Sequence, residues 1–399
     1  MVSSTIIITL ILIAILIALG LYFGLRSSSK DNEQRQIETL KSLPAVGTAS
    51  PPELYNNEYL NKQILLRLRD FYIAAADYPY LATGASFGIP DLNILTHTIR
   101  AGPRFLAIDI HFDGKSSLDP DAIPVVRPLV LHPTAKPLKL EDVLNVIQEE
   151  AWANTEQPLI LYFRQLYSPS SKSLEDKIYK LINKYLGHKL IDKRYGYSRG
   201  TPNQFVPSED FPFSGSLGDI PIQDAINNVI IMTSVYPTES ESFNEIINAS
   251  TDPKDHRVRL MEYTKEHKEF GGLKGVVPNV NTVIENNRYF MSIIEMKDPE
   301  THDVLNMLDP AHNVENIDIN DINKYGCQIA LFHYYKQDKE FIEQQKIFAN
   351  SGFVMRPDEL RYIAKPKEKP TEQNINRSLG PVTASIPGIG GDPFLSFDF

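Results

Sequence analysis

The sequence predicts an α/β protein, a TIM-like (β/α)8 barrel preceded by one transmembrane helix. Three observations support this. Short apolar runs alternate with amphipathic segments from about residue 80 onward, as in parallel strands connected by helices. About 290 residues of this pattern fit one eight-stranded barrel better than two domains. The first 25 residues include an uncharged apolar run long enough to span a bilayer.

The apolar run at the N-terminus predicts a membrane anchor over residues 1–26. Thr5–Leu25 carries no charge, and a bilayer core needs about 20 such residues in a helix. No basic residue precedes the run, so it does not resemble a cleavable signal peptide. Arg26, Lys30 and Arg35 follow it. The positive-inside rule then predicts that the bulk of the chain lies on the cytoplasmic side of the membrane.

Charge and cysteine content exclude several classes of protein. The 399 residues include 50 acidic and 40 basic side chains, a net charge of −10. Binding to nucleic acid and broad adhesion to anionic lipid both need basic surfaces, so we expect neither. Cys327 is the one cysteine, which excludes an intrachain disulfide framework and a cysteine zinc cluster.

The elements expected after the anchor follow in order. Residues 27–56 read as a polar tether, 57–362 as the barrel and 363–399, rich in proline, as a disordered tail. Residues 58–75 have helical spacing of apolar positions. Apolar runs predict strands at 104–112, 128–132, 158–163, 228–232 and 328–332. Amphipathic spacing predicts helices over 139–152 and after a cap at Ser173.

Several motifs, in the right order, resemble eukaryotic phosphatidylinositol-specific phospholipase C in its X half (about 78–235) and Y half (about 276–362). The X-like motifs are Ala101–Asp109, Val130–Thr134, Leu138–Leu144, Leu186–Leu190 and Ile220–Ile230. The Y-like motifs are Gly326–Leu331 and Gly352–Arg361, of which the second is the most specific. The resemblance implies a barrel of the PLC-like phosphodiesterase type, phosphoinositide substrates and a calcium ion.

The family's catalytic set is incomplete in this sequence. His132 stands at the second catalytic histidine and Asp109 at one calcium carboxylate. The first-histidine segment aligns with residues 83–87, which contain no histidine. The remaining metal and phosphate positions fall at or near Ala107, Arg164, Met232 and Ser234. Calcium takes 6–8 oxygen ligands, so we expect the metal to be lost and no cofactor to replace it.

A metal-free site is the alternative that these residues allow. Bacterial relatives use an arginine two residues after the equivalent aspartate, and here that position is His111. Asp109 and His111 share a strand face. His132 and His111 are therefore the catalytic candidates, with Asp109 and Arg164 as substrate-binding residues. The other interpretation is that these side chains are hydrogen-bonded polar residues at a barrel mouth.

We therefore expect a membrane-anchored phospholipase C-like protein that is catalytically degenerate and serves as a binding or scaffold module. Its partners would be the lipid bilayer and a phosphoinositide headgroup; the sequence identifies no protein partner. Two alternatives stay open at this point. One is an active calcium-independent phosphodiesterase acting on phosphoinositides. The other is a structural membrane protein, for example of a virus, that kept the barrel as a stable body.

Overall fold

A computed structural model describes most of the barrel. The described residues are 31, 33–43, 66–82, 89–128, 135–196, 217–235, 239–252, 258–264, 269–271, 280–296, 315–361, 384–386 and 395–397. Contacts divide the chain into two units, Met1–Tyr362 and Ile363–Phe399. The predicted anchor at 1–26 lies outside the described residues. Within the described residues, no helix is long and apolar enough to cross a membrane.

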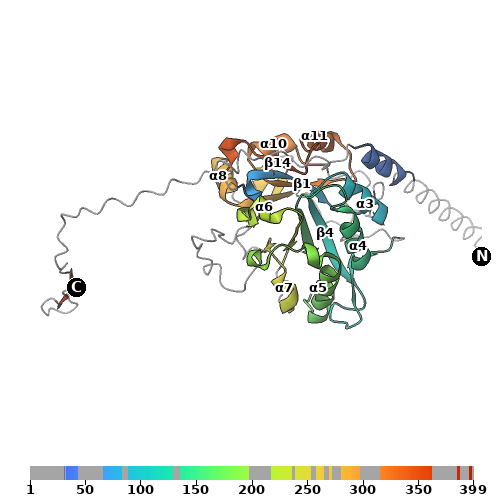
Figure 1. Cartoon of the computed structure of the whole chain (residues 1–399), viewed down its shortest axis with the longest axis horizontal. Coiled ribbons are helices and arrows are strands. Elements are labelled where there is room, and N and C mark those ends of the chain that lie inside the picture. The colour runs from blue at the N-terminus through green and yellow to red at the C-terminus, as the bar shows by residue number, and fades with distance from the viewer. Residues whose placement is uncertain are drawn as a thin grey trace, which may run out of the picture. The chain divides into compact units, whose positions relative to one another are not determined.

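Eight parallel strands form a nearly closed barrel (Figure 1). In chain order they are β1 (Phe71–Asp77), β4 (Phe105–Asp113), β7 (Leu159–Gln165), β8 (Val229–Thr233), β9 (Ala249–Ser250), β10 (Val258–Thr264), β12 (Met291–Met296) and β13 (Ile329–His333). Each pairs in parallel with the next, except that β9 and β10 are not paired among the described residues. β13 pairs with β1, for example Ile73 with Ile329, and so joins the last strand of the barrel to the first. The predicted TIM-like barrel is thus confirmed.

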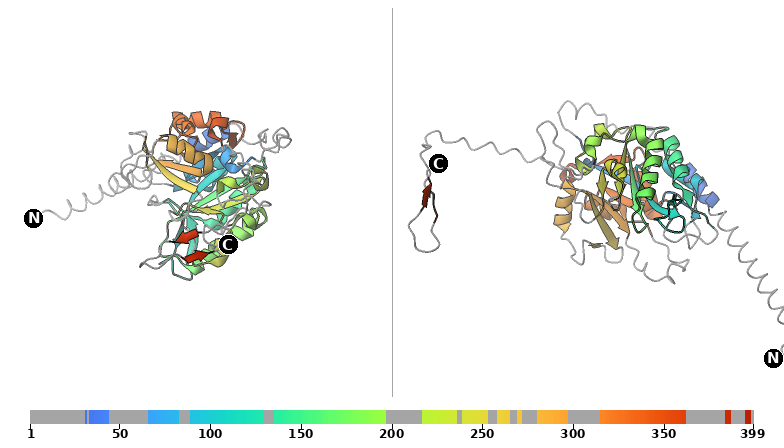
Figure 2. Two further views of the ribbon diagram at one scale, coloured as in Figure 1. Left: turned by 90° about the vertical axis from the view of Figure 1, so that its left-hand side faces the viewer. Right: turned by 90° about the horizontal axis from the view of Figure 1, so that it is seen from below.

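Helices lie outside the strands (Figures 1 and 2). They are α3 (Leu92–Arg100), α4 (Leu140–Glu150), α5 (Lys172–Leu186), α6 (Ile222–Ala225), α7 (Glu241–Glu245), α8 (Val280–Tyr289), α10 (Ile319–Lys324) and α11 (Lys339–Ile347). Short 3-10 turns are Leu68–Asp70, Gly187–Lys189, Lys193–Tyr195, Leu217–Asp219 and Asp358–Leu360. The remaining strands are β2 (Leu81–Ala82), β3 (Ile89–Pro90), β5 (Ile123–Val126), β6 (Leu138–Lys139), β11 (Glu269–Gly271), β14 (Phe353–Met355), β15 (Ala384–Ile386) and β16 (Leu395–Phe397).

The two faces of each strand bury different clusters. Alternate residues such as Ile73, Phe105 and Tyr162 form the barrel interior. Their neighbours, such as Leu106 and Phe163, pack with the helices in a second cluster. Because the side-chain period of a strand is two, each strand continues its interior row to its last residue. This row decides which side chains reach the carboxyl end of the barrel, called the mouth below.

Two predictions of secondary structure are wrong, one in the type of element and one in the residue that caps a helix. The segment predicted as a helix over 58–75 is strand β1 from Phe71 onward, and its residues 58–65 lie outside the described residues. β1 is buried along its whole length, so it shows no apolar–polar alternation and its alanines mimic a helix. The cap of α5 is Ser171, not Ser173, and its hydroxyl accepts from the amide of Leu174.

The predicted strand at 128–132 is described only at Pro128, and β5 pairs antiparallel with β4 just before it.

Part of the predicted tether belongs to the barrel. Residues 33–42 are helical, and the helix buries Ile37 against Ala82 and Ile94. The amide of Gln36 donates to the carbonyl of Leu81 at 3.0 Å. The tether prediction is therefore wrong for this stretch, because its few apolar residues fall on one helix face and find a barrel surface to cover. In the tail predicted to be disordered, β15 and β16 pair antiparallel.

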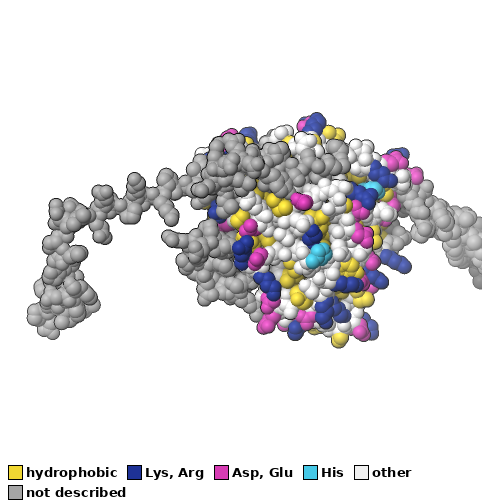
Figure 3. Space-filling model, viewed as in Figure 1, with side chains coloured by type: hydrophobic (Ala, Val, Ile, Leu, Met, Phe, Trp, Pro, Cys, Tyr) yellow, Lys and Arg dark blue, Asp and Glu magenta, His cyan; other side chains and the backbone are white. Residues whose placement is uncertain are grey.

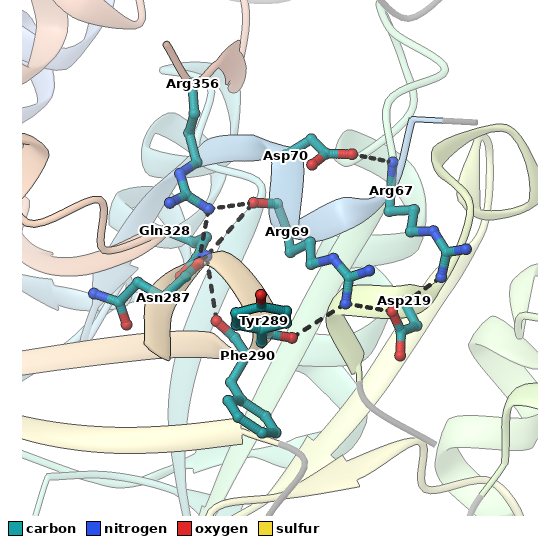
Figure 4. Close-up of polar contacts among 9 residues, drawn as sticks. All are labelled: Arg67, Arg69, Asp70, Asp219, Asn287, Tyr289, Phe290, Gln328 and Arg356. Atoms are coloured by element: carbon teal, nitrogen blue, oxygen red, sulfur yellow. Dashed lines mark hydrogen bonds and ion pairs between the residues drawn. The ribbon is translucent and has the colours of Figure 1, made fainter. Parts of the chain in front are cut away.

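Buried polar side chains close the amino end of the barrel, called the base (Figure 4). Arg356 donates to the carbonyls of Arg69 at 2.6 Å and Asn287 at 3.0 Å. Gln328 donates to the carbonyl of Asn287 at 2.7 Å. Asp219 forms ion pairs with Arg67 and Arg69. This base network links the first and last thirds of the chain.

Candidate functional site

Four polar side chains continue the interior rows of neighbouring strands at the mouth. Asp77 ends β1 and His333 ends β13, and the two are register partners. Asp109 on β4 is the register partner of Arg164 on β7. Active sites in TIM barrels sit at this end of the strands. We call Asp77, Asp109, Arg164 and His333 the mouth cluster.

Arg164 bridges both carboxylates of the mouth cluster. Its Nε donates to Asp109 Oδ1 at 2.5 Å, and its Nη2 donates to Asp77 Oδ1 at 2.6 Å. The side chains of Arg164, Asp77 and Asp109 are 12%, 7% and 1% exposed. The guanidinium therefore reaches across β4 to β1 in an environment that excludes most water. Charged hydrogen bonds of this kind fix geometry strongly.

The electrostatics of the cluster reflect two carboxylates sharing one guanidinium. Burial raises the pKa of Asp109 to about 6, the attraction of Arg164 opposes this rise, and Asp77 adds to it. Burial lowers the pKa of Arg164, but attraction to Asp77 and Asp109 outweighs it, so the net pKa lies well above the usual value. Arg164 therefore stays charged, and Asp109 is the carboxyl that can take up a proton.

His333 extends the cluster and is held in an aromatic stack. Its Nδ1 lies 3.8 Å from Asp77 Oδ2, beyond hydrogen-bonding distance. Its ring stacks between Tyr78 and Tyr335, with centroid distances of 6.2 and 5.0 Å. The guanidinium of Arg164 lies 4.4 Å from the centre of the Tyr78 ring, a cation–π contact. Burial lowers the pKa of His333, so the imidazole is neutral near pH 7.

His111 lies on the same face of β4 as Asp109, as the sequence predicts, but its Nε2 makes no hydrogen bond to the described residues of the cluster. It is 4% exposed, and its Nε2 has no hydrogen-bond partner among the described residues. Burial lowers its pKa to about 4, with a smaller contribution from Arg127. His132 and residues 83–87 lie outside the described residues. The structure therefore brings Asp109 and Arg164 together and leaves His111 separate.

The described side chains of the mouth do not by themselves fit a calcium ion. Among the residues that the structure describes, no group of three or more His, Cys, Asp or Glu side chains could hold a metal. The two carboxylates that converge here already bind the guanidinium of Arg164. Calcium requires several oxygen ligands around one point, so no chemical step is derived through it.

Sequence reasoning missed Asp77 and His333. Both follow apolar runs, FYIAAA and IALF, that become β1 and β13. A polar residue at the carboxyl end of a buried parallel strand is the signal that could have found them. The first barrel strand ends at Asp77, six residues before the segment 83–87 in which a first histidine was sought. The group that β1 brings to the mouth is a carboxylate.

Comparisons with known proteins found similarities in sequence and in fold. Residues 66–209 match the sequence model described as phosphatidylinositol-specific phospholipase C, X domain. No curated protein matches the chain in sequence. Among solved structures, PLC21 of L. pealei has a TM-score of 0.53 at 16% identity, covering 74% of this chain and 38% of that chain. PLC21 of S. officinalis has a TM-score of 0.53 at 17% identity, covering 75% of this chain and 38% of that chain.

The structural similarity shows the fold, and the chain spans less than two fifths of the length of these two relatives, 38% in each case. The X-domain match begins at the residue where the described barrel begins, Leu66. It contains Asp77, Asp109 and Arg164, whereas His333 lies beyond it. Residues 66–209 are therefore similar in sequence to the X domain of phosphatidylinositol-specific phospholipase C, within a barrel whose fold is similar to that of the two PLC21 structures.

Proposed function

We propose that this protein is a membrane-anchored, phospholipase C-like barrel that has lost turnover and serves as a binding or scaffold module for phosphoinositide-containing membranes. The observation that carries the proposal is Arg164, which is bonded to both Asp77 and Asp109. A built-in cation occupies the space between the carboxylates. Those carboxylates are no longer available to a metal or to a substrate hydroxyl.

The chemistry of phosphodiester cleavage supports the loss of turnover. Cleavage needs a base for the inositol hydroxyl and an acid for the leaving oxygen. It also needs positive charge against the phosphoryl oxygens. Both acidic partners of Arg164 offset its charge. His333 is buried in an aromatic stack, and its pKa is lowered.

A calcium-independent phosphodiesterase is the second candidate, and one observation favours it. Asp109, whose pKa is raised to about 6, could exchange a proton near neutral pH. In that case Arg164 would supply the charge that calcium supplies elsewhere in the family. His333 would then be the candidate base, with its Nδ1 3.8 Å from Asp77 Oδ2.

Release of inositol phosphates separates the two candidates. The full chain in mixed micelles of phosphatidylinositol, or of its bisphosphate, should release none between pH 5 and 8, with or without calcium. Release that is lost in Asp77→Asn and kept in Glu149→Gln, an exposed control on α4, would establish the enzyme instead. Loss of at least 100-fold is the expected signature of removing a catalytic acid or base.

Membrane association is tested separately. The full chain should float with phosphatidylcholine vesicles, because Thr5–Leu25 is uncharged and long enough to span them. A variant lacking residues 1–25 should stay in the aqueous fraction and unfold cooperatively. Aggregation or non-cooperative melting of that variant would mean that the apolar run is part of the barrel.

A further inference from the structure

Exposed apolar side chains gather at the mouth end of the barrel. Six large hydrophobic residues are exposed among the described residues. Four of them follow the carboxyl ends of β4, β7 and β8: Leu118 at 60% exposed, Ile123 at 48%, Leu166 at 37% and Val235 at 46%. Single exposed hydrophobic residues are ordinary on a protein surface. Four on adjoining loops at one end are not expected by scatter.

The loops that carry these residues are bonded to one another. The hydroxyl of Ser117 donates to the carbonyl of Pro169 at 2.8 Å, which joins the loop of Leu118 to the loop after β7. The amide of Gln165 donates to the hydroxyl of Ser234 at 2.9 Å, which joins β7 to the loop of Val235. We call Leu118, Ile123, Leu166 and Val235 the apolar rim.

The helix at 33–42 attaches the N-terminal segment beside this end. Gln36 binds the carbonyl of Leu81, and Ile37 packs on Ala82. Leu81 and Ala82 form β2, which starts four residues after β1 ends at the mouth. Only residues 26–32 separate this helix from the apolar run at 5–25. Such a link spans at most about 25 Å when fully extended.

We propose that the helix at 33–42 fixes the barrel on its anchor so that the apolar rim lies against the lipid bilayer. This inference rests on the proposed membrane anchoring. A short link to a docked helix leaves the barrel little freedom to turn its mouth away from the membrane. The apolar rim then gains the transfer of exposed apolar area out of water.

The contact depends on apolar burial more than on lipid charge. Asp113, Lys115 and Asp121 are exposed between and beside the rim residues, so no single sign of charge dominates there. Figure 3 shows acidic and basic side chains interspersed over the described part of one face. Contact with the bilayer should therefore occur on neutral phosphatidylcholine, without anionic lipid.

Depth-dependent quenching of tryptophan tests the orientation. The full chain, carrying Trp152→Phe, is reconstituted in phosphatidylcholine vesicles with and without brominated acyl chains. Tryptophan placed by Leu118→Trp or Leu166→Trp should be quenched strongly. Ile342→Trp is the matched control, since Ile342 is 52% exposed but lies on α11, and it should be quenched severalfold less.

A second variant tests the helix. Ile37→Asn with Leu40→Asn should release the helix from the barrel, since both side chains are buried there, and rim quenching should fall towards the Ile342→Trp value. Lys41→Ala, on the exposed side of the same helix, should leave quenching unchanged. Equal quenching at rim and control positions in vesicle-bound protein would overturn the inference alone. Protein that fails to float with vesicles would overturn the proposed anchoring as well.

Discussion

The base and the mouth of the barrel both bury charged side chains, but they use them differently. At the base, Arg356 and Gln328 donate to backbone carbonyls of Arg69 and Asn287 (Figure 4). At the mouth, Arg164 binds the carboxylates of Asp77 and Asp109. Backbone acceptors cannot change their charge, whereas carboxylates can. The contacts of Arg356 at the base therefore do not depend on the protonation of their acceptors, whereas those of Arg164 at the mouth do.

Removal of Arg356 should cause the largest loss of stability. Arg356 is 1% exposed, and Arg356→Ala would remove its hydrogen bonds to the carbonyls of Arg69, Asn287 and Leu360 and open a cavity. We expect the free energy of unfolding to fall by about 3–5 kcal/mol at any pH between 5 and 8. Chemical denaturation measures the change.

The control for this prediction is another arginine. Arg100 is 53% exposed and pairs with Glu150 on the surface, so Arg100→Ala should cost less than about 1 kcal/mol. A loss in Arg356→Ala no larger than in Arg100→Ala would show that the base does not hold the barrel together.

Arg164→Ala should lower the free energy of unfolding nearly as much as Arg356→Ala at pH 7, and by less at lower pH. Arg164→Ala leaves Asp77 and Asp109 buried without their cation. This should lower the free energy of unfolding by about 3–5 kcal/mol. The pKa of Asp109, already raised to about 6, should rise further. A carboxyl with a raised pKa contributes stability at low pH that is lost as the pH rises through that pKa.

The loss in Arg164→Ala should therefore shrink as the pH is lowered from 7 to 5. Denaturation of wild type and variant at the two values measures this difference. The same comparison in Arg356→Ala should show a smaller recovery, because Arg356 bonds backbone carbonyls and is only one of several groups that lower the pKa of Asp70. A pH-independent loss in both variants would remove the distinction between mouth and base.

His111 gives the mouth a second, opposite response to pH. Burial lowers its pKa to about 4, against about 6.5 for an ordinary histidine. Folding thus favours the neutral form of His111. Its contribution to the free energy of unfolding, about 3 kcal/mol, is present above pH 6.5 and is lost as the pH falls to 4. His111→Gln should remove this acid-dependent loss. Unfolding measured from pH 4 to 7 tests it, with the exposed His188→Gln as the matched control.

The smallest effect is expected at a glycine of the base. Gly326 has φ +68°, and a Cβ there would lie 2.7 Å from Nη2 of Arg356. Gly326→Ala should cost about 1–3 kcal/mol through backbone strain and displacement of the guanidinium. In Gly187→Ala the new Cβ meets only the flexible side chain of Asn183, so the change should stay within about 1 kcal/mol. Equal effects on the melting temperature would contradict this account of the base.

The sequence by itself determined the barrel, because alternating strands and helices leave a local periodic pattern. It also named Asp109 and Arg164 as site residues, since both fall at or near metal-binding positions of the family that the motifs resemble. It could not identify β1, because a strand buried on both faces carries no alternation and FYIAAAD has helical spacing. Only the tertiary structure brought Asp77 and His333 together, since residues 256 positions apart become register partners when β13 pairs with β1. It also placed Arg164 between the carboxylates of Asp77 and Asp109. This arrangement depends on which strands are neighbours in the sheet, and no local sequence pattern shows that.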